Sequence, residues 1–354
     1  MRREEFDVAV VGVGPAGSTL ARITAEAGLR VLLVDRRAEI GVPVQCAEYV
    51  SGLILRHVAL SRGCVAQEVS AMRTHLPNGE VGVSRAPGFI LNRAVFDKHL
   101  AILAARAGAD VRTHATATWD GEFTLHNSLG HFPIVAKVVV GADGPRSTIG
   151  KAIGRVNTRF VAATQVEVVA GGHSDATEVY FDRRFRGGYG WYFPKGDSAN
   201  VGVGLEGASG AALSEALEMF LENLQESGRL GRITRLRRCG GLVPVDGPLG
   251  PVSGNVLLVG DAAGHAHPMS GAGILNAIIA GELAGEAVVG AARAGEPSLL
   301  EGYAEGVSTV LDEPLRRACE KRERLLASWD GDDDTFCQVV KTSWYPFDRV
   351  AQYT

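Results

Sequence analysis

The chain has 354 residues, of which 46% are hydrophobic and 21% are charged, and its formal net charge at pH 7 is -4. That length allows two domains or one large domain, and the apolar fraction is enough for the core of a globular protein. A weakly acidic chain has no general attraction to nucleic acid or to anionic lipid. The charge balance therefore excludes a partner recruited by charge alone, and we expect no nucleic-acid partner.

The cysteines and the start of the chain indicate a cytoplasmic protein. Five cysteines are scattered along the chain without a CxxC pair: Cys46, Cys64, Cys239, Cys319 and Cys337. Such a set is not typical of a disulfide framework or a structural zinc site. The first five residues, MRREE, lead directly into a strand pattern, so we expect no signal peptide. The most apolar helical stretch, 274–289, carries Glu282 and Glu286 and is expected to be too short to span a bilayer.

The N-terminal part of the chain has the pattern of a βαβ unit. Residues 6–11 and 30–34 are apolar, β-branched runs, and residues 15–27 between them have a helical pattern. Two further valine-rich strands, 135–140 and 256–259, also lead into glycine-rich segments. If these strands share one sheet, the first domain is assembled from separate parts of the chain.

The chain between the last two of these strands indicates a second domain. Residues 161–252 alternate between apolar and polar types, which is typical of an antiparallel sheet with one wet face. Within them, residues 211–225 have the pattern of an amphipathic helix. We expect a β-rich substrate domain here, with contributions from about residues 55–90. It is inserted into a discontinuous first domain of residues 1–160 and 253–300.

The remainder of the chain is predicted to be helical. Residues 301–326 are charged and have a helical pattern, so we expect a C-terminal helical segment over residues 301–354. The acidic run DGDDD, 330–334, is predicted to be an exposed loop within it.

A glycine-rich turn opens the first helix. The motif Gly12-Val13-Gly14-Pro15-Ala16-Gly17 follows a strand, and Asp35 ends the next strand. In this context the glycines allow a tight turn, close approach of the backbone to a pyrophosphate, and helix–strand packing. Asp35 is expected to accept a hydrogen bond from a ribose hydroxyl, and Arg36 stands beside it. The alternative is a glycine-rich turn that binds no ligand.

The other two glycine-rich junctions indicate which dinucleotide is bound. GADGPRS, 141–147, and VGDAAGHAHPMSGAGI, 259–274, resemble the further flavin motifs of the FAD-dependent hydroxylase and reductase superfamily, which has a glutathione-reductase-like fold. The resemblance implies that Asp261 binds the ribityl and pyrophosphate end of FAD. It also implies that the backbone at Gly273 and Ile274, at a helix start, faces the isoalloxazine, where the helix dipole favours an anionic reduced flavin.

A third stretch, LNRAVFDKHLA at 91–101, matches the arginine-containing helix start of the same superfamily, so Arg93 is a further candidate for FAD binding. Simpler roles remain for two of these residues. Asp143 alternatively caps a turn, and Arg93 alternatively pairs with Asp97 one helical turn away.

Two motifs resemble the geranylgeranyl reductase family. Tyr189-x-Trp191-x-Phe193-Pro194, followed after seven residues by Gly202-x-Gly204, is similar to the YxWxFP…GxG signature of that family at every fixed position. PVQCAEYVSG, 43–52, is similar to a second stretch of the family, which usually reads Cys-Gly-Glu where this chain has Cys46-Ala47-Glu48. The resemblance covers roughly residues 6–310.

The resemblance implies an α/β fold: an FAD-binding Rossmann-like domain of the glutathione-reductase type, with an inserted antiparallel β-sheet substrate domain and a C-terminal helical segment. It also implies that reduced flavin delivers hydride to isolated carbon–carbon double bonds of a polyprenyl substrate. NADPH or a ferredoxin-type protein would be the electron donor, and the enzyme would be cytoplasmic with peripheral membrane contact. The implied FAD contacts are Gly12, Gly14, Ala16, Gly17, Asp35, Arg36, Cys46, Ala47, Arg93, Asp261, Gly273 and Ile274.

Alternation along a strand adds a prediction about the substrate. Tyr189, Trp191 and Phe193 would project to one face as an aromatic wall, which suits a long apolar chain and stabilises positive charge near it. The alternative is an ordinary stripe of sheet core. Gly202 and Gly204, which lack side chains, are expected to let ligand or flavin approach the strand closely.

Proton donation is assigned less uniquely. By the resemblance Cys46 lies near the flavin, where it either donates a proton as a catalytic residue or only shapes the pocket. Glu48 is another proton source or a surface acid. His265 and His267 lack a second pair of ligands nearby in sequence, so we expect no metal site. His267 departs from the family, in which an acidic residue often precedes the proline.

Two other functions compete with the reductase. A flavin monooxygenase (hydroxylase) or halogenase would use the same fold on an apolar or aromatic substrate, although the chain has no lysine before Lys98 of the kind that halogenases need. The second is a non-catalytic flavin-binding electron carrier or regulator.

Overall fold

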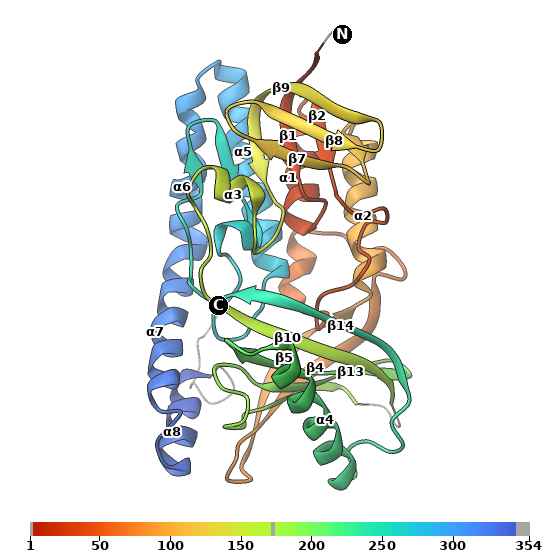
Figure 1. Ribbon diagram of the computed structural model, residues 1–354, viewed down its shortest axis with the longest axis vertical. Helices are drawn as coiled ribbons and strands as arrows, with labels where there is room; N and C mark the ends of the chain where they lie inside the picture. Colours follow the sequence, from red (N-terminus) through yellow and green to blue (C-terminus); the bar gives the residue numbers. More distant parts are fainter. Residues whose placement is uncertain (1–2, 171–173, 345–354) are drawn as a thin grey trace.

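The computed structural model describes residues 3–170 and 174–344, which form two eight-stranded sheets with helices packed on them (Figure 1). The first, called here the parallel sheet, has the strand order β15 (Val252–Ser253), β16 (Val256–Leu258), β9 (Gly130–Gly141), β1 (Glu4–Val11), β2 (Val31–Val34) and β6 (Asp110–Arg112), with β8 (Phe123–Asn127) on β9 and β7 (Thr116–Trp119) on β8. β1, β2, β6, β9 and β16 pair in parallel. This sheet therefore joins segments from both ends of the chain.

Both faces of the parallel sheet are buried. Val8 and Val10 of β1 point toward α1 (Pro15–Glu26), α2 (Arg93–Arg106) and α5 (Ile274–Ala294), in one hydrophobic cluster. Ala9 and Val11 point the opposite way, toward β7, β8 and β9 and the short helix α3 (Thr148–Ala152). A parallel sheet requires such cover on both faces, which is why its strands read as continuous apolar runs.

The second sheet, called here the antiparallel sheet, is built largely from the predicted insert. Its order is β14 (Arg235–Pro244), β10 (Phe160–Val169), β13 (Ser198–Glu206), β12 (Gly190–Lys195), β11 (Ala176–Tyr180), β4 (Val65–His75), β5 (Val81–Leu91) and β3 (Tyr49–Ser51). All neighbours pair antiparallel except β11 and β4, which are parallel. That pair joins the insert to an earlier part of the chain, so no hairpin connects it.

The antiparallel sheet is covered differently on its two faces. The predicted amphipathic helix, α4 (Gly210–Glu226), packs Leu217 and Phe220 against one face. On the other face lie α7 (Glu313–Ala327) and α8 (Asp333–Ser343). In Figure 1, α6 (Glu301–Val307) and α7 run nearly end to end along one side of the molecule. A π-helical turn, Ser308–Asp312, joins them.

The acidic run 330–334 was predicted to be an exposed loop. All five residues are exposed, but the loop assignment is wrong for Asp333 and Asp334, which belong to a helix. Asp332 caps α8, because its side chain accepts a hydrogen bond of 2.8 Å from the backbone of Thr335, and α8 begins at Asp333. Acidic residues at a helix start are favoured by the helix dipole. Residues 345–354, the end of the predicted C-terminal segment, lie outside the described residues.

The predicted length of the apolar helix also needs correction. α5 is 21 residues long and is the one described helix whose length and composition would allow it to cross a membrane. Half of the most apolar 18-residue stretch of this helix is buried inside the protein, where it packs against α1 and other elements. A Cβ on Gly281 would lie 2.5 Å from the carbonyl oxygen of Ala16, and one on Gly285 would lie 3.0 Å from Cβ of Ile23. Glycine at these positions lets the two helices touch, as in a core helix.

Candidate active site

A cavity of about 1340 Å³ lies between the two sheets. Its lining combines the three glycine-rich junctions of the parallel sheet with one face of the antiparallel sheet and residues of α7. The volume exceeds the roughly 300–1,000 Å³ typical of a pocket for one small ligand. The cavity therefore has room for a dinucleotide and part of a second molecule.

The first glycine-rich turn has a different steric reason for each glycine. Gly12 has a φ of 109°, and a Cβ there would lie 2.2 Å from the carbonyl oxygen of Ala142. A Cβ on Gly17 would lie 2.1 Å from the carbonyl oxygen of Gly12, so this position permits the helix to pack on the strand. Gly14 has no atom within 4 Å of its Cβ position and lines the cavity. The turn thus leaves open backbone at the start of α1, which fits a pyrophosphate.

Asp35 has a structural role beside the one predicted. Its Oδ2 accepts a hydrogen bond of 3.0 Å from the backbone amide of Val13, and its Oδ1 accepts one of 2.8 Å from that of Arg37. These bonds brace the glycine-rich turn against the end of β2. Asp35 and Arg36 both line the cavity, where ribose contact stays a prediction.

The third glycine-rich junction brings Asp261, Gly273 and Ile274 to the same cavity. A Cβ on Gly273 would lie 3.2 Å from Oδ1 of Asp261, so the helix start and the carboxylate are close. Asn157 donates a hydrogen bond of 2.9 Å to the backbone oxygen of Asp261. Burial raises the pKa of Asp261 to about 6, against the opposing effect of the Arg93 guanidinium.

The raised pKa of Asp261 gives a first testable prediction. Between the ordinary pKa and about 6 the folded apoprotein binds a proton that the unfolded chain does not, so its free energy of unfolding falls as pH rises through that window. Asp261→Asn should therefore stabilise the apoprotein by up to about 3 kcal/mol near pH 7, and by almost nothing near pH 4. Urea unfolding of both apoproteins at the two pH values measures this. A variant that is less stable than wild type near pH 7 would contradict it.

Arg93 and Asp143 make the structural contacts that were named as alternatives to cofactor binding. Arg93 binds Asp97 through bonds of 2.9 and 3.0 Å. Although burial opposes its charge, Asp97 raises the pKa of Arg93 above its usual range. Asp143 accepts hydrogen bonds from Ser147 and from both the backbone and hydroxyl of Thr148, so it caps the turn before α3. Arg93 also lines the cavity, and its contact with FAD stays a prediction.

The aromatic residues lie on one face of the antiparallel sheet. Tyr189, Trp191 and Phe193 all line the cavity and belong to one hydrophobic cluster. The rings of Tyr189 and Trp191 meet edge to face with centroids 6.1 Å apart, and the Tyr189 hydroxyl donates a bond of 2.5 Å to the backbone oxygen of Ser270. Tyr192 points to the opposite face, where Arg229 lies 3.8 Å above its ring. Strand alternation thus presents three rings toward the cavity.

The predicted role of the GxG pair is wrong for Gly202. Gly202 is the cross-strand partner of Trp191 in β12–β13 pairing, and a Cβ on Gly202 would lie 2.3 Å from Cζ2 of that indole. A Cβ on Gly204 would lie 2.9 Å from Cγ1 of Val161. The space left by Gly202 is filled by the Trp191 ring of the protein itself. Glycine is needed there to let the aromatic wall lie flat on the sheet.

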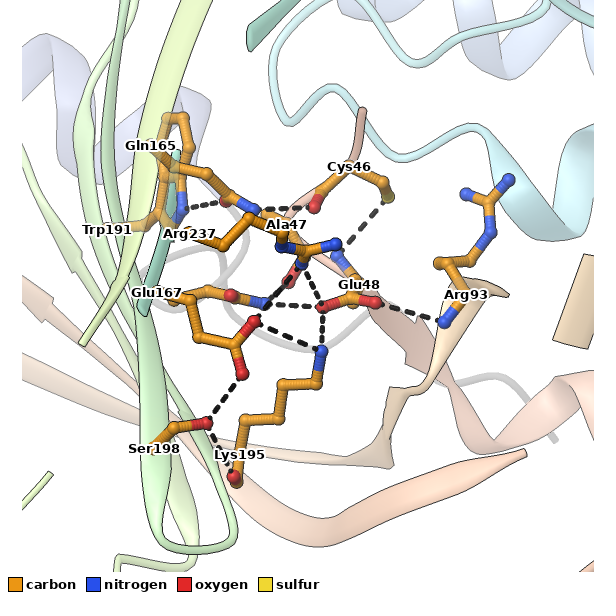
Figure 2. Close-up of polar contacts among 11 residues, drawn as sticks. Cys46, Ala47, Glu48, Arg93, Gln165, Glu167, Trp191, Lys195, Ser198 and Arg237 are labelled. Atoms are coloured by element: carbon orange, nitrogen blue, oxygen red, sulfur yellow. Dashed lines mark hydrogen bonds and ion pairs between the residues drawn. The ribbon is translucent and has the colours of Figure 1, made fainter. Parts of the chain in front are cut away.

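The Cys46–Ala47–Glu48 segment is tied to the aromatic wall by one side chain (Figure 2). The indole nitrogen of Trp191 donates a bond of 3.1 Å to the Gln165 side chain, whose amide nitrogen donates one of 2.8 Å to the backbone oxygen of Cys46. Burial raises the pKa of the Cys46 thiol, whereas the nearby Arg93 guanidinium lowers it. Cys46 and Ala47 line the cavity. Sequence reasoning missed Gln165, because a glutamine in a strand carries no signal for this bridge.

The surface-acid alternative for Glu48 is wrong. Glu48 is 0% exposed, and its carboxylate is bound by Lys195, Asn200 and the backbone amide of Arg93. Figure 2 shows the bonds to Glu48 from Lys195 and from the backbone of Arg93, below Cys46. A carboxylate with no access to solvent can persist only with such partners.

The C-terminal helices also contribute to the cavity. Trp344, just beyond α8, packs edge to face on Tyr189 with centroids 5.4 Å apart, and its indole nitrogen donates a bond of 3.1 Å to Thr74. On α7, Arg322 pairs with Glu206 at 2.8 Å. Sequence reasoning did not assign Trp344 or Arg322 to the site, because their contact partners lie more than 100 residues away along the chain.

The two histidines lie in the third glycine-rich junction. Over residues 3–170 and 174–344 there is no group of three or more His, Cys, Asp and Glu side chains that could hold a metal ion. Nδ1 of His267 accepts a bond of 3.2 Å from the backbone of Ser270. Burial lowers the pKa of both His265 and His267 to about 4, so both rings are neutral near pH 7.

The fold and the cavity define an FAD-dependent oxidoreductase, and comparisons with known proteins identify the family. Residues 5–74 match the family described as FAD binding domain, and residues 160–242 match the geranylgeranyl reductase catalytic domain. Digeranylgeranylglycerophospholipid reductase 1 of Methanopyrus kandleri is 39% identical over 80% of this chain and 80% of its own length. The corresponding reductase of Methanosarcina acetivorans is 36% identical over 93% of this chain and 83% of its own. The chain belongs to the geranylgeranyl reductase family.

Solved structures agree with this assignment. The crystal structure of a geranylgeranyl bacteriochlorophyll reductase-like protein from Thermoplasma acidophilum superposes with a TM-score of 0.87 at 30% identity, over 97% of this chain and 93% of that one. A flavin-dependent brominase, at 16% identity and a TM-score of 0.72, shares the fold alone. The predicted family, fold class and FAD-dependent enzyme are confirmed. The reductase is supported over the halogenase alternative, and the reductase names of these relatives support an enzyme.

Proposed function

We propose that this enzyme saturates isolated carbon–carbon double bonds in the geranylgeranyl chains of a digeranylgeranylglycerophospholipid. The observation that carries the proposal is a single cavity lined by both the dinucleotide turn and the three rings of Tyr189, Trp191 and Phe193. An apolar, aromatic wall fits a polyprenyl chain. The names of the relatives from Methanopyrus kandleri and Methanosarcina acetivorans supply the lipid class.

The residues divide into those that hold FAD and those that face the substrate. The cofactor residues that line the cavity are Gly12, Gly14, Ala16, Asp35, Arg36, Cys46, Ala47, Arg93, Asp261, Gly273 and Ile274. Gly17 supports the turn from behind, through its contact with Gly12. When bound and reduced, FAD would supply a hydride to one alkene carbon.

The other alkene carbon must receive a proton. Cys46 is the proposed donor, because burial raises the pKa of its thiol and keeps the proton on sulfur near pH 7. Trp191 and its neighbouring rings face the site where a tertiary carbon gains positive character, and aromatic faces stabilise such charge. If Cys46 only shapes the pocket, the proton comes from another group and the aromatic wall keeps its role.

We further propose that NADPH or a ferredoxin-type protein supplies the electrons. The enzyme is placed in the cytoplasm, in peripheral contact with the membrane that contains the lipid. The membrane contact follows from the proposed substrate, since a chain anchored in a bilayer must be reached from its surface.

A direct assay tests the function. Holoenzyme reduced with dithionite under anaerobic conditions is mixed with digeranylgeranylglycerophospholipid, and the intact lipid is analysed by mass spectrometry. We expect two hydrogen atoms to be added per double bond, with one reduced flavin oxidised for each. The same lipid with fully saturated chains serves as the control and should leave the flavin reduced. An unchanged lipid, or one that gains oxygen when air is admitted, would contradict the proposal.

A further inference from the structure

We propose that Lys195 and Glu48 form a buried ion pair that positions the Cys46 thiol at the cavity and sets its electrostatic surroundings. Lys195 directly follows the YxWxFP motif, so the strand that carries the aromatic wall also carries this cation. The inference deepens the proposed function and rests on it, because it concerns the residue proposed to hold the proton.

The geometry of the pair is closely determined. Oε2 of Glu48 lies 2.5 Å from Nζ of Lys195 and accepts a bond of 2.8 Å from Asn200 of β13. Oε1 accepts a bond of 2.9 Å from the backbone amide of Arg93 at the start of α2. Lys195 itself is largely buried, with 11% of its side chain exposed. One carboxylate thus joins β12, β13 and α2 beneath the Cys46 segment.

The backbone of Glu48 links this clamp to the thiol. Its φ is 75°, in the left-handed region that non-glycine residues rarely adopt, and its amide donates a bond of 3.2 Å to Sγ of Cys46. Such a conformation persists only where the surroundings determine it, and it is often found at functional sites. Because the side chain is held at one end and the amide bonds the thiol at the other, Lys195 acts on Cys46 through Glu48.

A second ion pair, Glu167 with Arg237, lies next to Lys195 and Glu48 and balances their charges. Glu167 lies 3.2 Å from Arg237 and 3.8 Å from Lys195, and it accepts a bond of 2.9 Å from Ser198. Arg237 lies 3.7 Å from Glu48. Two cations therefore face two carboxylates, and removal of either member of the Lys195–Glu48 pair leaves a net charge close to the thiol (Figure 2).

The groups that act on the thiol come from four parts of the chain. Burial raises the pKa of Cys46, Arg93 and the hydrogen bond from the Glu48 backbone amide lower it, and the charge of the Glu48 carboxylate raises it. Tyr189 at the start of the aromatic wall and Cys239 on β14 also interact with Cys46 electrostatically. Loss of the Glu48 charge should favour the thiolate, whereas loss of the Lys195 charge should disfavour it. If the ion pair only held the Cys46 segment in place, removing Glu48 or removing Lys195 would loosen the segment alike. Both variants would then change the reactivity of Cys46 in the same direction.

The test is the rate at which methyl methanethiosulfonate modifies Cys46 in the oxidised holoenzyme, followed by peptide mass spectrometry across a pH range. Thiolate is the reactive form, so the rate reports the thiol pKa. Glu48→Gln is expected to react roughly tenfold faster than wild type near pH 7, and Lys195→Met several-fold slower, about the effect of one nearby charge. Lys195→Arg keeps the cation and should react like wild type.

Two controls isolate the effect. Cys319, which is half-buried beside Asp246, serves as the internal reference thiol. Lys137→Met removes an exposed lysine that pairs with Asp7 at 2.7 Å, far along the chain from this network, and should leave Cys46 unchanged.

Opposite shifts in the two variants support the proposal, and equal shifts or none overturn it. If Lys195→Met yields no folded flavoprotein, the pH profile of Glu48→Gln decides alone. A rate curve displaced to lower pH supports the proposal, because it shows a lower thiol pKa, and a curve with an unchanged midpoint overturns it even if the rate at high pH has risen. No lipid is used in this assay. Its outcome is therefore independent of whether the proposed lipid is the substrate, which the saturation assay tests separately.

Discussion

Gly202→Ala is expected to lower the rate of polyprenyl saturation by about 100-fold while the protein still binds FAD, because small displacements at a reacting site have effects of that order. The new Cβ would lie 2.3 Å from Cζ2 of Trp191 and 2.6 Å from Cβ of Gln165. Backbone pairing holds β12 against β13, so the indole must turn toward the cavity. We expect a loss of about 1–3 kcal/mol in stability from the overpacking. Oxidation of reduced flavin by the lipid measures the rate, and visible absorbance measures FAD content.

Trp191→Ala separates crowding from the role of the ring. Removing a buried indole costs about 3–5 kcal/mol in stability and should slow flavin oxidation by the lipid without changing FAD content. In the double variant Gly202→Ala, Trp191→Ala, the methyl group has space, so the stability loss should be less than the sum of the two. Activity should remain low. Wild-type rates in Gly202→Ala or Trp191→Ala would remove the aromatic-wall argument.

Gly12→Ala is expected to yield little folded flavoprotein, whereas Gly14→Ala should fold normally and bind FAD weakly. The Cβ of an alanine at position 12 would lie 2.2 Å from the carbonyl oxygen of Ala142. The backbone there also has a φ of 109°, which residues other than glycine rarely adopt. The contacted atoms are backbone atoms of Ala142 and Asp143, just beyond the end of β9, and they cannot rotate away as a side chain can. A left-handed conformation alone costs about 1–2 kcal/mol. A typical domain has only about 5–15 kcal/mol of stability, so the combined strain is a large part of it.

Position 14 differs because its side-chain direction is open. The backbone there has a φ of -90°, which any residue adopts, and no atom lies within 4 Å of the Cβ position. The added methyl group should change stability by less than about 0.5 kcal/mol but stand where the pyrophosphate is expected. Urea unfolding and flavin fluorescence titration measure the two effects. Equal FAD affinity in Gly14→Ala and wild type would contradict the predicted cofactor contact.

The fold was predictable where the evidence lies within a short stretch of chain. The βαβ unit is marked by two apolar strands, a helix between them and the glycines of 12–17, all within the first 35 residues. Alternation assigned Tyr189, Trp191 and Phe193 to one face because a strand has a period of two. The pairing of β11 with β4 was not predictable in this way, because the two strands come from distant parts of the chain.

The same distinction between local motifs and long-range contacts applies to the residues of the site. Glu48 was recognised from its motif, but only its burial and its bond to Lys195 distinguish it from a surface acid. Gly202 was recognised as a required glycine, but the ring that fills its space became evident only from the cross-strand register. Gln165 had no local signal at all.

The sequence by itself determined the family, the FAD-binding class and the set of rings that face the cavity. Each of these depends on residues whose spacing and local backbone geometry define a motif. The tertiary structure alone decided that Gly202 makes room for Trp191, that Glu48 is clamped by Lys195, and that Trp344 packs against the aromatic wall. The physical reason is that steric contact and charge pairing depend on distance in space, and in this protein the partners come from strands and helices far apart along the chain.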